Sequence, residues 1–145
     1  MELKPQLSNQ LRQLRMSGVM ETLEARNRQA IDSQWSYMDF LSRLLEDETE
    51  RRAQKQLSMR LRRSTLNTTK TIEGFDFQFN PNLNRQQILQ LASCEYLRQH
   101  RNLLICGPSG VGKTHLAQAL GQEAVRQGLD VLFVSVQKML QHLNG

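Results

Sequence analysis

The chain has 145 residues, a formal net charge of +5, and 39% hydrophobic and 23% charged side chains. This composition is typical of a soluble globular protein with one domain or two small ones. No apolar run approaches the roughly 20 residues that span a bilayer, which excludes a membrane-spanning helix. The first fifteen residues lack the hydrophobic centre of a signal peptide, so we expect a cytoplasmic protein without a membrane partner. Cys94 and Cys106 are too few for a disulfide framework or a zinc site, and we expect two buried structural thiols.

The basic excess lies in the first half of the chain. Residues 1–70 hold thirteen Lys and Arg against nine Asp and Glu, whereas residues 71–145 hold six against five. Such an asymmetry suggests a polyanionic partner, although a small net charge also serves solubility.

Residues 1–70 contain one glycine and one proline and no strand alternation, which predicts helices. A first helix carries leucines at helical spacing, and Ser17-Gly18 interrupts the pattern before a second. Ser36 followed by Asp39 is a capping-box pattern and predicts that a third helix begins there. The apolar residues of the three helices are Leu3, Leu7, Leu11 and Leu14, then Val19, Met20, Leu23 and Ile31, then Tyr37, Phe40, Leu41, Leu44 and Leu45.

The third helix is expected to be long and to end in a basic run. Asp47 and Glu48 each precede an arginine by four residues, an order that stabilises a helix. No acidic residue occurs between Arg51 and Arg63. The run is either a solvated helix face or a surface that contacts DNA phosphates without reading sequence, and both interpretations stay open. The candidate DNA contacts are Arg51, Arg52, Lys55, Arg60, Arg62 and Arg63.

Residues 64–70 are polar and poor in helix formers, so we expect a linker and two domains, residues 1–68 and 69–145. Phe75, Phe77 and Phe79 alternate with polar residues, which predicts an extended segment with three rings on one side. Asn84, with Gln87 three residues later, resembles a helix cap.

The second domain is organised around GPSGVGKT, residues 107–114. An apolar run at 103–106 predicts a buried strand before it, and a helix over 115–127 follows, with Gly128 as its cap. The apolar run 131–134 is typical of a parallel strand covered on both faces, and 137–143 starts another helix. The predicted fold is therefore α/β, with a helical domain followed by an incomplete phosphate-loop domain.

The spacing G-x-x-x-x-G-K-[ST] predicts a phosphate-binding loop for ATP with Mg²⁺. Small residues let successive backbone N–H groups surround phosphate oxygens at the positive end of a helix. Lys113 would reach the β- and γ-phosphates, and the Thr114 hydroxyl would ligate Mg²⁺. No catalytic residue is assigned. The candidate cofactor-binding residues are Gly107, Pro108, Ser109, Gly110, Val111, Gly112, Lys113 and Thr114.

The sequence resembles the IstB-like ATPases of insertion-sequence transposition, which are close to helicase loaders of the DnaC type within the AAA+ proteins. The resemblance rests on the helical first domain and on three stretches: FDFQFNPNLNRQQI, NLLICGPSGVGKTHLAQALG and VLFVSV. It implies an ATPase that assembles on DNA as a homo-oligomer and assists a transposase. It also implies that Phe79 and Asn80 are candidates for contact with the adenine base.

The resemblance further implies that such ATPases continue beyond the equivalent of residue 145. The acidic strand end, the sensor residues and the arginine finger would lie in that continuation, and the two strands expected here would not be neighbours in the sheet. We therefore expect no ATP hydrolysis by these 145 residues alone, and Lys113-dependent turnover would contradict this expectation. The alternatives are a helicase loader and a non-enzymatic protein that binds DNA or a partner.

Overall fold

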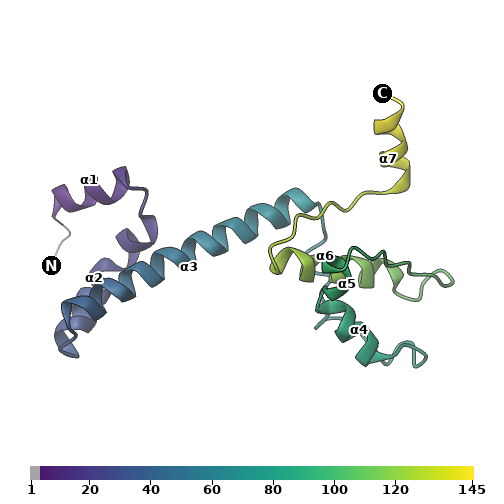
Figure 1. Ribbon diagram of the computed structural model, residues 1–145, viewed down its shortest axis with the longest axis horizontal. Coiled ribbons are helices and arrows are strands. Elements are labelled where there is room, and N and C mark those ends of the chain that lie inside the picture. Colours follow the sequence, from purple (N-terminus) through teal and green to yellow (C-terminus); the bar gives the residue numbers. More distant parts are fainter. Residues whose placement is uncertain (1–3) are drawn as a thin grey trace. The chain divides into compact units, whose positions relative to one another are not determined.

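The chain folds into α-helices joined by loops. The computed structural model describes residues 4–145, and the helices lie along the chain as Figure 1 labels them. They are α1 (Pro5–Gln13), α2 (Ser17–Asp32), α3 (Tyr37–Ser64), α4 (Arg85–Ala92), α5 (Glu95–Arg98), α6 (Lys113–Arg126) and α7 (Val136–Leu143). None of these helices is both long and apolar enough to cross a membrane.

The chain divides into two compact units, Met1–Gln56 and Leu57–Gly145. Helix α3 contributes residues to both units. The domain boundary that composition predicts, between residues 68 and 69, stays a prediction.

The first unit contains the three helices that the leucine spacing and the caps predict. Helix α2 begins at Ser17, and the start of α3 is fixed by Ser36, whose hydroxyl accepts the Asp39 N–H at 3.1 Å. The predicted start of the third helix and its length are therefore confirmed, although the Asp39 carboxylate accepts the Ser36 hydroxyl, so the second bond of a capping box is replaced by this one. Leu3 lies outside the described residues. The buried apolar residues of this unit are Leu11, Val19, Leu23 and Leu44.

The second unit is built around α6. Helix α4 packs on it, and its start is capped as predicted, because the Asn84 carboxamide oxygen accepts the N–H groups of Gln86 and Gln87. Gly128 has a φ of 89° after the end of α6, which confirms the predicted left-handed cap. The buried residues of this core are Ile72, Phe75, Ile88, Leu116, Ala119 and Leu120.

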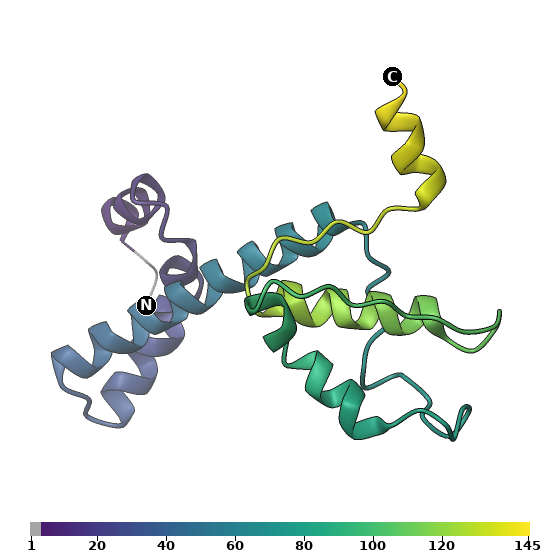
Figure 2. The ribbon, with the colours of Figure 1, turned by 45° about the vertical axis from the view of Figure 1, so that its right-hand side comes forward.

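The predicted α/β fold class is wrong for this structure. Within residues 4–145 no strand or sheet is formed, and the two segments expected as buried strands run as loops in Figures 1 and 2. Leu104 is 85% exposed and Leu132 is 68% exposed, so the apolar runs are not covered on both faces. A β-strand exists only through hydrogen bonds to a neighbouring strand, and these two segments do not pair.

The second of these segments bonds to the end of α3 instead. The Phe133 N–H donates to the Ser64 carbonyl oxygen at 2.8 Å, and the Thr65 hydroxyl donates to the Phe133 carbonyl oxygen at 2.5 Å. These bonds satisfy part of the backbone of an extended segment without a sheet. The apolar sequence predicts that this segment is extended, but it does not predict which part of the chain forms hydrogen bonds with it.

Two smaller expectations also differ from the structure. Cys94 is buried as predicted, and burial raises the pKa of its thiol, but Cys106 is exposed. Phe75 is buried and Phe77 is half-buried, whereas Phe79 is 69% exposed. The three rings therefore do not share one covered side, because residues 73–83 form turns rather than an extended strand.

Candidate nucleotide-binding site

The predicted phosphate loop leads directly into α6. Gly110 and Gly112 have φ angles of 80° and 94°, in the left-handed region that L side chains rarely adopt. Gly112 immediately precedes Lys113, the first residue of α6. The loop thus ends at the positive end of a helix of 14 residues, where unpaired backbone N–H groups favour an anion.

The Lys113 ammonium group is bonded to its own loop. It donates to the carbonyl oxygens of Gly107 and Pro108, each at 2.6 Å. Such charge-assisted bonds join the Lys113 side chain to the backbone at the start of the loop. A phosphate would compete with these two carbonyl groups for the same ammonium.

A hollow of about 130 Å³ adjoins the loop. Its walls come from the loop, from the segment before it and from the region between Phe75 and Leu83. Ligand pockets typically measure roughly 300–1,000 Å³, so this hollow is smaller than a typical ligand pocket. The lining residues are Phe75, Asn80, Leu83, Ile105, Cys106, Gly107, Pro108, Val111, Gly112, Lys113 and Leu116.

A larger hollow, of about 490 Å³, lies beside α6 but not at the loop. It is bounded by Tyr96, by Leu103 and Ile105, and by Val131, which belong to the two unpaired segments and the helix before them. Its walls carry neither Lys113 nor the glycines of the loop. Size alone therefore does not identify a nucleotide site, and the smaller hollow is the one lined by the predicted phosphate loop.

Phe75 supports the loop from behind. A Cβ atom added to Gly112 would lie 3.2 Å from the Phe75 ring, which shows how closely the ring packs on this glycine. The same ring meets the His115 imidazole edge-on, with centroids 5.2 Å apart. Only glycine satisfies both the backbone angle and the space at position 112.

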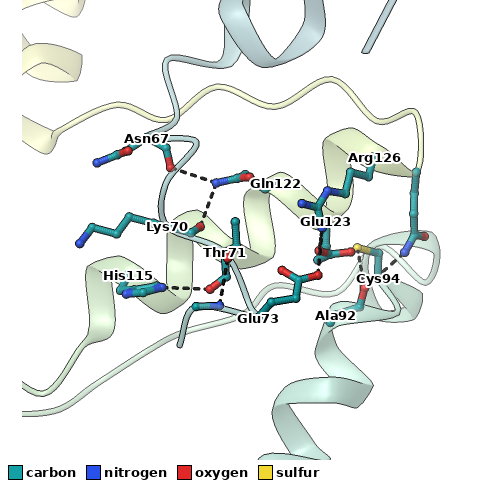
Figure 3. A network of polar contacts seen from close by, with 12 residues as sticks. Asn67, Lys70, Thr71, Glu73, Ala92, Cys94, His115, Gln122, Glu123 and Arg126 are labelled. Carbon is teal, nitrogen blue, oxygen red and sulfur yellow. Dashed lines mark hydrogen bonds and ion pairs between the residues drawn. The ribbon is translucent and has the colours of Figure 1, made fainter. Parts of the chain in front are cut away.

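Polar contacts tie residues 67–73 along α6, as Figure 3 shows. The Gln122 carboxamide, 3% exposed, donates to the carbonyl oxygens of Asn67 at 2.9 Å and Lys70 at 2.8 Å. His115 Nε2 lies 3.0 Å from the Thr71 carbonyl oxygen and is the donor, because that oxygen can only accept. These bonds fix the segment that carries Phe75, and through it the backbone around Gly112.

The groups around the loop fit a magnesium-bound triphosphate. Lys113 provides a positive charge, the glycines allow close approach of backbone N–H groups, and Thr114 is an exposed hydroxyl in the first turn of α6. When bound, Mg²⁺ would neutralise phosphate charge and Thr114 would be its protein ligand. The assignment of these residues stays a prediction.

The two residues predicted to contact the base differ in position. Asn80 lines the hollow next to the loop, whereas Phe79 is largely exposed and does not line it. Leu83 and Ile105 are apolar neighbours in the same hollow that the sequence did not predict as site residues. Phe75, His115 and Gln122 were also missed as supports of the loop, because their roles depend on contacts across more than thirty residues of chain.

The six candidate DNA contacts fall into two chemical groups. Three have acidic neighbours: Arg51 pairs with Glu21, Arg52 with Glu48, and Arg60 lies 3.8 Å from Asp130. The other three are Lys55, Arg62 and Arg63, whose exposed side chains form no hydrogen bond or ion pair with residues 4–145. The second group has charge available for an external anion.

Comparison with known proteins identifies the relatives of this chain. A protein of Mycobacterium tuberculosis, named "Putative ATP-binding protein Rv3427c in insertion sequence", is 41% identical over 141 residues, which cover 97% of this chain and 56% of that protein. A Pseudomonas aeruginosa protein, "Insertion sequence IS21 putative ATP-binding protein", is 36% identical and covers 92% of this chain and 50% of its own length. A Bacteroides fragilis relative, "Insertion sequence IS21-like putative ATP-binding protein", is 28% identical over 94% of this chain and 52% of itself.

The chain thus spans about half the length of the curated relatives that it matches. The family described as "IstB-like ATP binding protein" matches residues 9–145, which is nearly the whole chain. The resemblance inferred from the phosphate loop and its surroundings is therefore confirmed. This chain belongs to the IstB-like family of insertion-sequence ATP-binding proteins.

Proposed function

We propose that this chain binds ATP with Mg²⁺ at residues 107–114, contacts DNA through its basic first half, and assists a transposase within a homo-oligomer. The family and the names of the relatives support ATP binding in an insertion-sequence context. The observation that carries the nucleotide part is the loop itself, with two left-handed glycines and Lys113 at the start of α6.

ATP binding proceeds by an exchange of partners at Lys113. The ammonium group bonds to the carbonyl oxygens of Gly107 and Pro108. Phosphate oxygens carry full negative charge and are better acceptors than carbonyl oxygens, so the β- and γ-phosphates draw the ammonium away from the loop. The backbone N–H groups at the start of α6 then hold the phosphate oxygens.

The test is ATP binding by calorimetry in the presence of Mg²⁺, with Lys113→Ala as the variant. A hydrogen bond from a charged group contributes about 1.5–3 kcal/mol, so we expect affinity to fall roughly 10- to 100-fold. Lys138→Ala removes an exposed charge from α7 and serves as the control, with unchanged affinity expected. Equal affinities for the Lys113 variant and the unchanged protein would reject the proposed nucleotide site.

The DNA part is supported by the uncompensated cations of the basic run. Lys55, Arg62 and Arg63 can approach phosphates without losing an internal ion pair. Charge reversal at Arg51 or Arg52 would also break pairs with Glu21 or Glu48 and would confuse binding with folding. The three unpaired residues are therefore the cleaner targets.

We expect nonspecific duplex binding whose affinity falls steeply as salt rises, because each neutralised phosphate releases counterions. Neutralising Lys55, Arg62 and Arg63 together should weaken binding and reduce the salt dependence, measured by fluorescence anisotropy. Unchanged affinity in this triple variant would favour the other interpretation, a solvated helix face. Retention of the chain on immobilised transposase, compared with a replicative helicase, separates the transposition helper from the helicase loader.

A further inference from the structure

A basic hollow lies within the first unit, between the α1–α2 connection and α3. It measures about 360 Å³. Of its seven lining residues four are basic and one is acidic, an imbalance that favours an anion. They are Leu14, Arg15, Ser17, Glu48, Arg51, Arg52 and Lys55.

The helical repeat of α3 brings its basic residues to this hollow. Arg51, Arg52 and Lys55 follow Glu48 by three, four and seven residues and therefore project from the same face. Arg15 comes from the connection opposite, where its φ is 55°. The Arg52 guanidinium donates to the Arg15 carbonyl oxygen at 3.4 Å and joins the connection to α3.

The one acidic residue that lines the hollow, Glu48, already has partners for its negative charge. Glu48 Oε2 accepts the N–H groups of Gly18 at 2.7 Å and Val19 at 3.2 Å, and Oε1 accepts Arg52 Nε at 2.8 Å. Burial by itself raises the pKa of Glu48, but the bonds from Arg52 and from the two N–H groups outweigh it, and the net pKa is lowered. The carboxylate is thus charged, fully bonded and compensated.

The four basic residues that line the hollow differ in whether their side chains already have a partner. Arg51 bonds to the Ser17 hydroxyl and pairs with Glu21, and Arg52 pairs with Glu48. The side chains of Arg15 and Lys55 are exposed and form no hydrogen bond or ion pair with residues 4–145. Two positive charges therefore border the hollow without a counter-charge.

We propose that this hollow binds one backbone phosphate of duplex DNA, with Arg15 and Lys55 as its two cationic contacts. The inference rests on the DNA-binding part of the proposed function and adds Arg15, which lies outside the basic run of α3 and was not predicted from sequence. Arg52 positions Arg15 by donating a hydrogen bond to the Arg15 carbonyl oxygen. Glu48 in turn positions Arg52 by accepting a hydrogen bond from its guanidinium group.

The openness of the site favours a duplex over a free ion. Both cations are exposed, and the N–H groups of Gly18 and Val19 are already taken by Glu48, so the hollow offers a single phosphate ion only screened charges. A duplex presents many phosphates at once, and counterion release adds over all of them.

The experiment compares two double variants of the whole chain in a duplex-binding titration from low to moderate salt. Arg15→Gln with Lys55→Gln removes the two charges at the hollow. Arg12→Gln with Arg28→Gln removes two exposed charges elsewhere in the same unit and is the matched control. Circular dichroism must show equal helix content in both.

For the variant at the hollow we expect about tenfold weaker binding and a salt slope reduced by about one, which corresponds to one lost phosphate contact. The control should lose less than about threefold, the nonspecific effect of net charge on steering. Equal losses in the two variants would overturn the phosphate site but leave DNA binding by the chain intact.

Two further outcomes separate the remaining possibilities. If the unchanged chain does not bind duplex at all, the DNA part of the proposed function fails, and this inference fails with it. If millimolar inorganic phosphate displaces the duplex at constant ionic strength, the hollow prefers the free ion, and the assignment to the duplex backbone is overturned.

Discussion

At the scale of single residues, glycine marks the places where backbone must come close to other atoms. Gly18 lies so near α3 that an added Cβ would be 2.8 Å from the Glu48 Cα atom. That approach allows the Glu48 carboxylate to reach the first N–H groups of α2. Gly112 has the corresponding position in the second unit, where the phosphate loop packs against the Phe75 ring.

The two left-handed glycines of the loop permit a matched comparison. Alanine at Gly110 or Gly112 meets the same unfavourable backbone angle, which costs about 1–2 kcal/mol. A Cβ at Gly110 has no neighbour within 4 Å, whereas at Gly112 it presses on Phe75 at 3.2 Å. We expect Gly112→Ala to weaken ATP binding more than Gly110→Ala does, measured by calorimetry. Equal affinities in the two variants would show that Phe75 does not support the loop.

At the scale of elements, an ion pair joins α2 to α3. The Arg26 guanidinium donates to both carboxylate oxygens of Asp47, at 2.6 and 2.8 Å. This bond from Arg26 lowers the pKa of Asp47 from 3.8 to about 2, and the Asp47 side chain is only 10% exposed. The pair thus stabilises the first unit while Asp47 is ionised.

The contribution of the Arg26–Asp47 pair to folding stability should depend on pH in the acid range. Because the pKa in the folded state is depressed, the stabilisation is fully present above about pH 4 and is lost as the pH falls towards 2. Its size at neutral pH is on the order of 2 kcal/mol. Asp47→Asn should lower the free energy of unfolding at pH 7 by about this amount and reduce its acid dependence, measured by urea titration at several pH values. The matched control is Asp32→Asn, at an exposed carboxylate on α2, and the proposal fails if both variants behave alike.

The helical elements were largely predictable, because their signals are local. Ser36 with Asp39 and Asn84 with Gln87 mark real helix starts, since a cap needs only residues two or three positions away. The strands were not predictable in the same way. Residues 103–106 and 131–134 have the apolar sequence of strands, but a strand requires a partner, and the second segment bonds to Ser64 and Thr65 instead.

At the scale of the whole molecule, the unpaired segments expose apolar side chains to solvent. Exposed apolar side chains promote association between molecules. The exposed apolar residues of the two unpaired segments and α7 include Leu104, Leu132, Val136, Met139, Leu140 and Leu143.

We therefore expect the chain to self-associate with rising concentration, measured by analytical ultracentrifugation. Leu104→Ser with Leu132→Ser, at positions 85% and 68% exposed, should reduce association without loss of helix content. Leu14→Ser, 64% exposed in the first unit, serves as the comparison and should have a smaller effect. Association that is unaffected by all three changes would show that these apolar residues are not its cause.

By itself the sequence determined where α3 and α4 begin and which family the chain belongs to, because helix caps and GPSGVGKT are patterns of neighbouring residues. Only the tertiary structure decided that the apolar runs stay unpaired, that Phe75 packs behind Gly112, and that Arg15 joins Lys55 beside one hollow. These features depend on contacts between residues far apart in the chain, and such contacts are set by packing and hydrogen-bond partners rather than by local spacing.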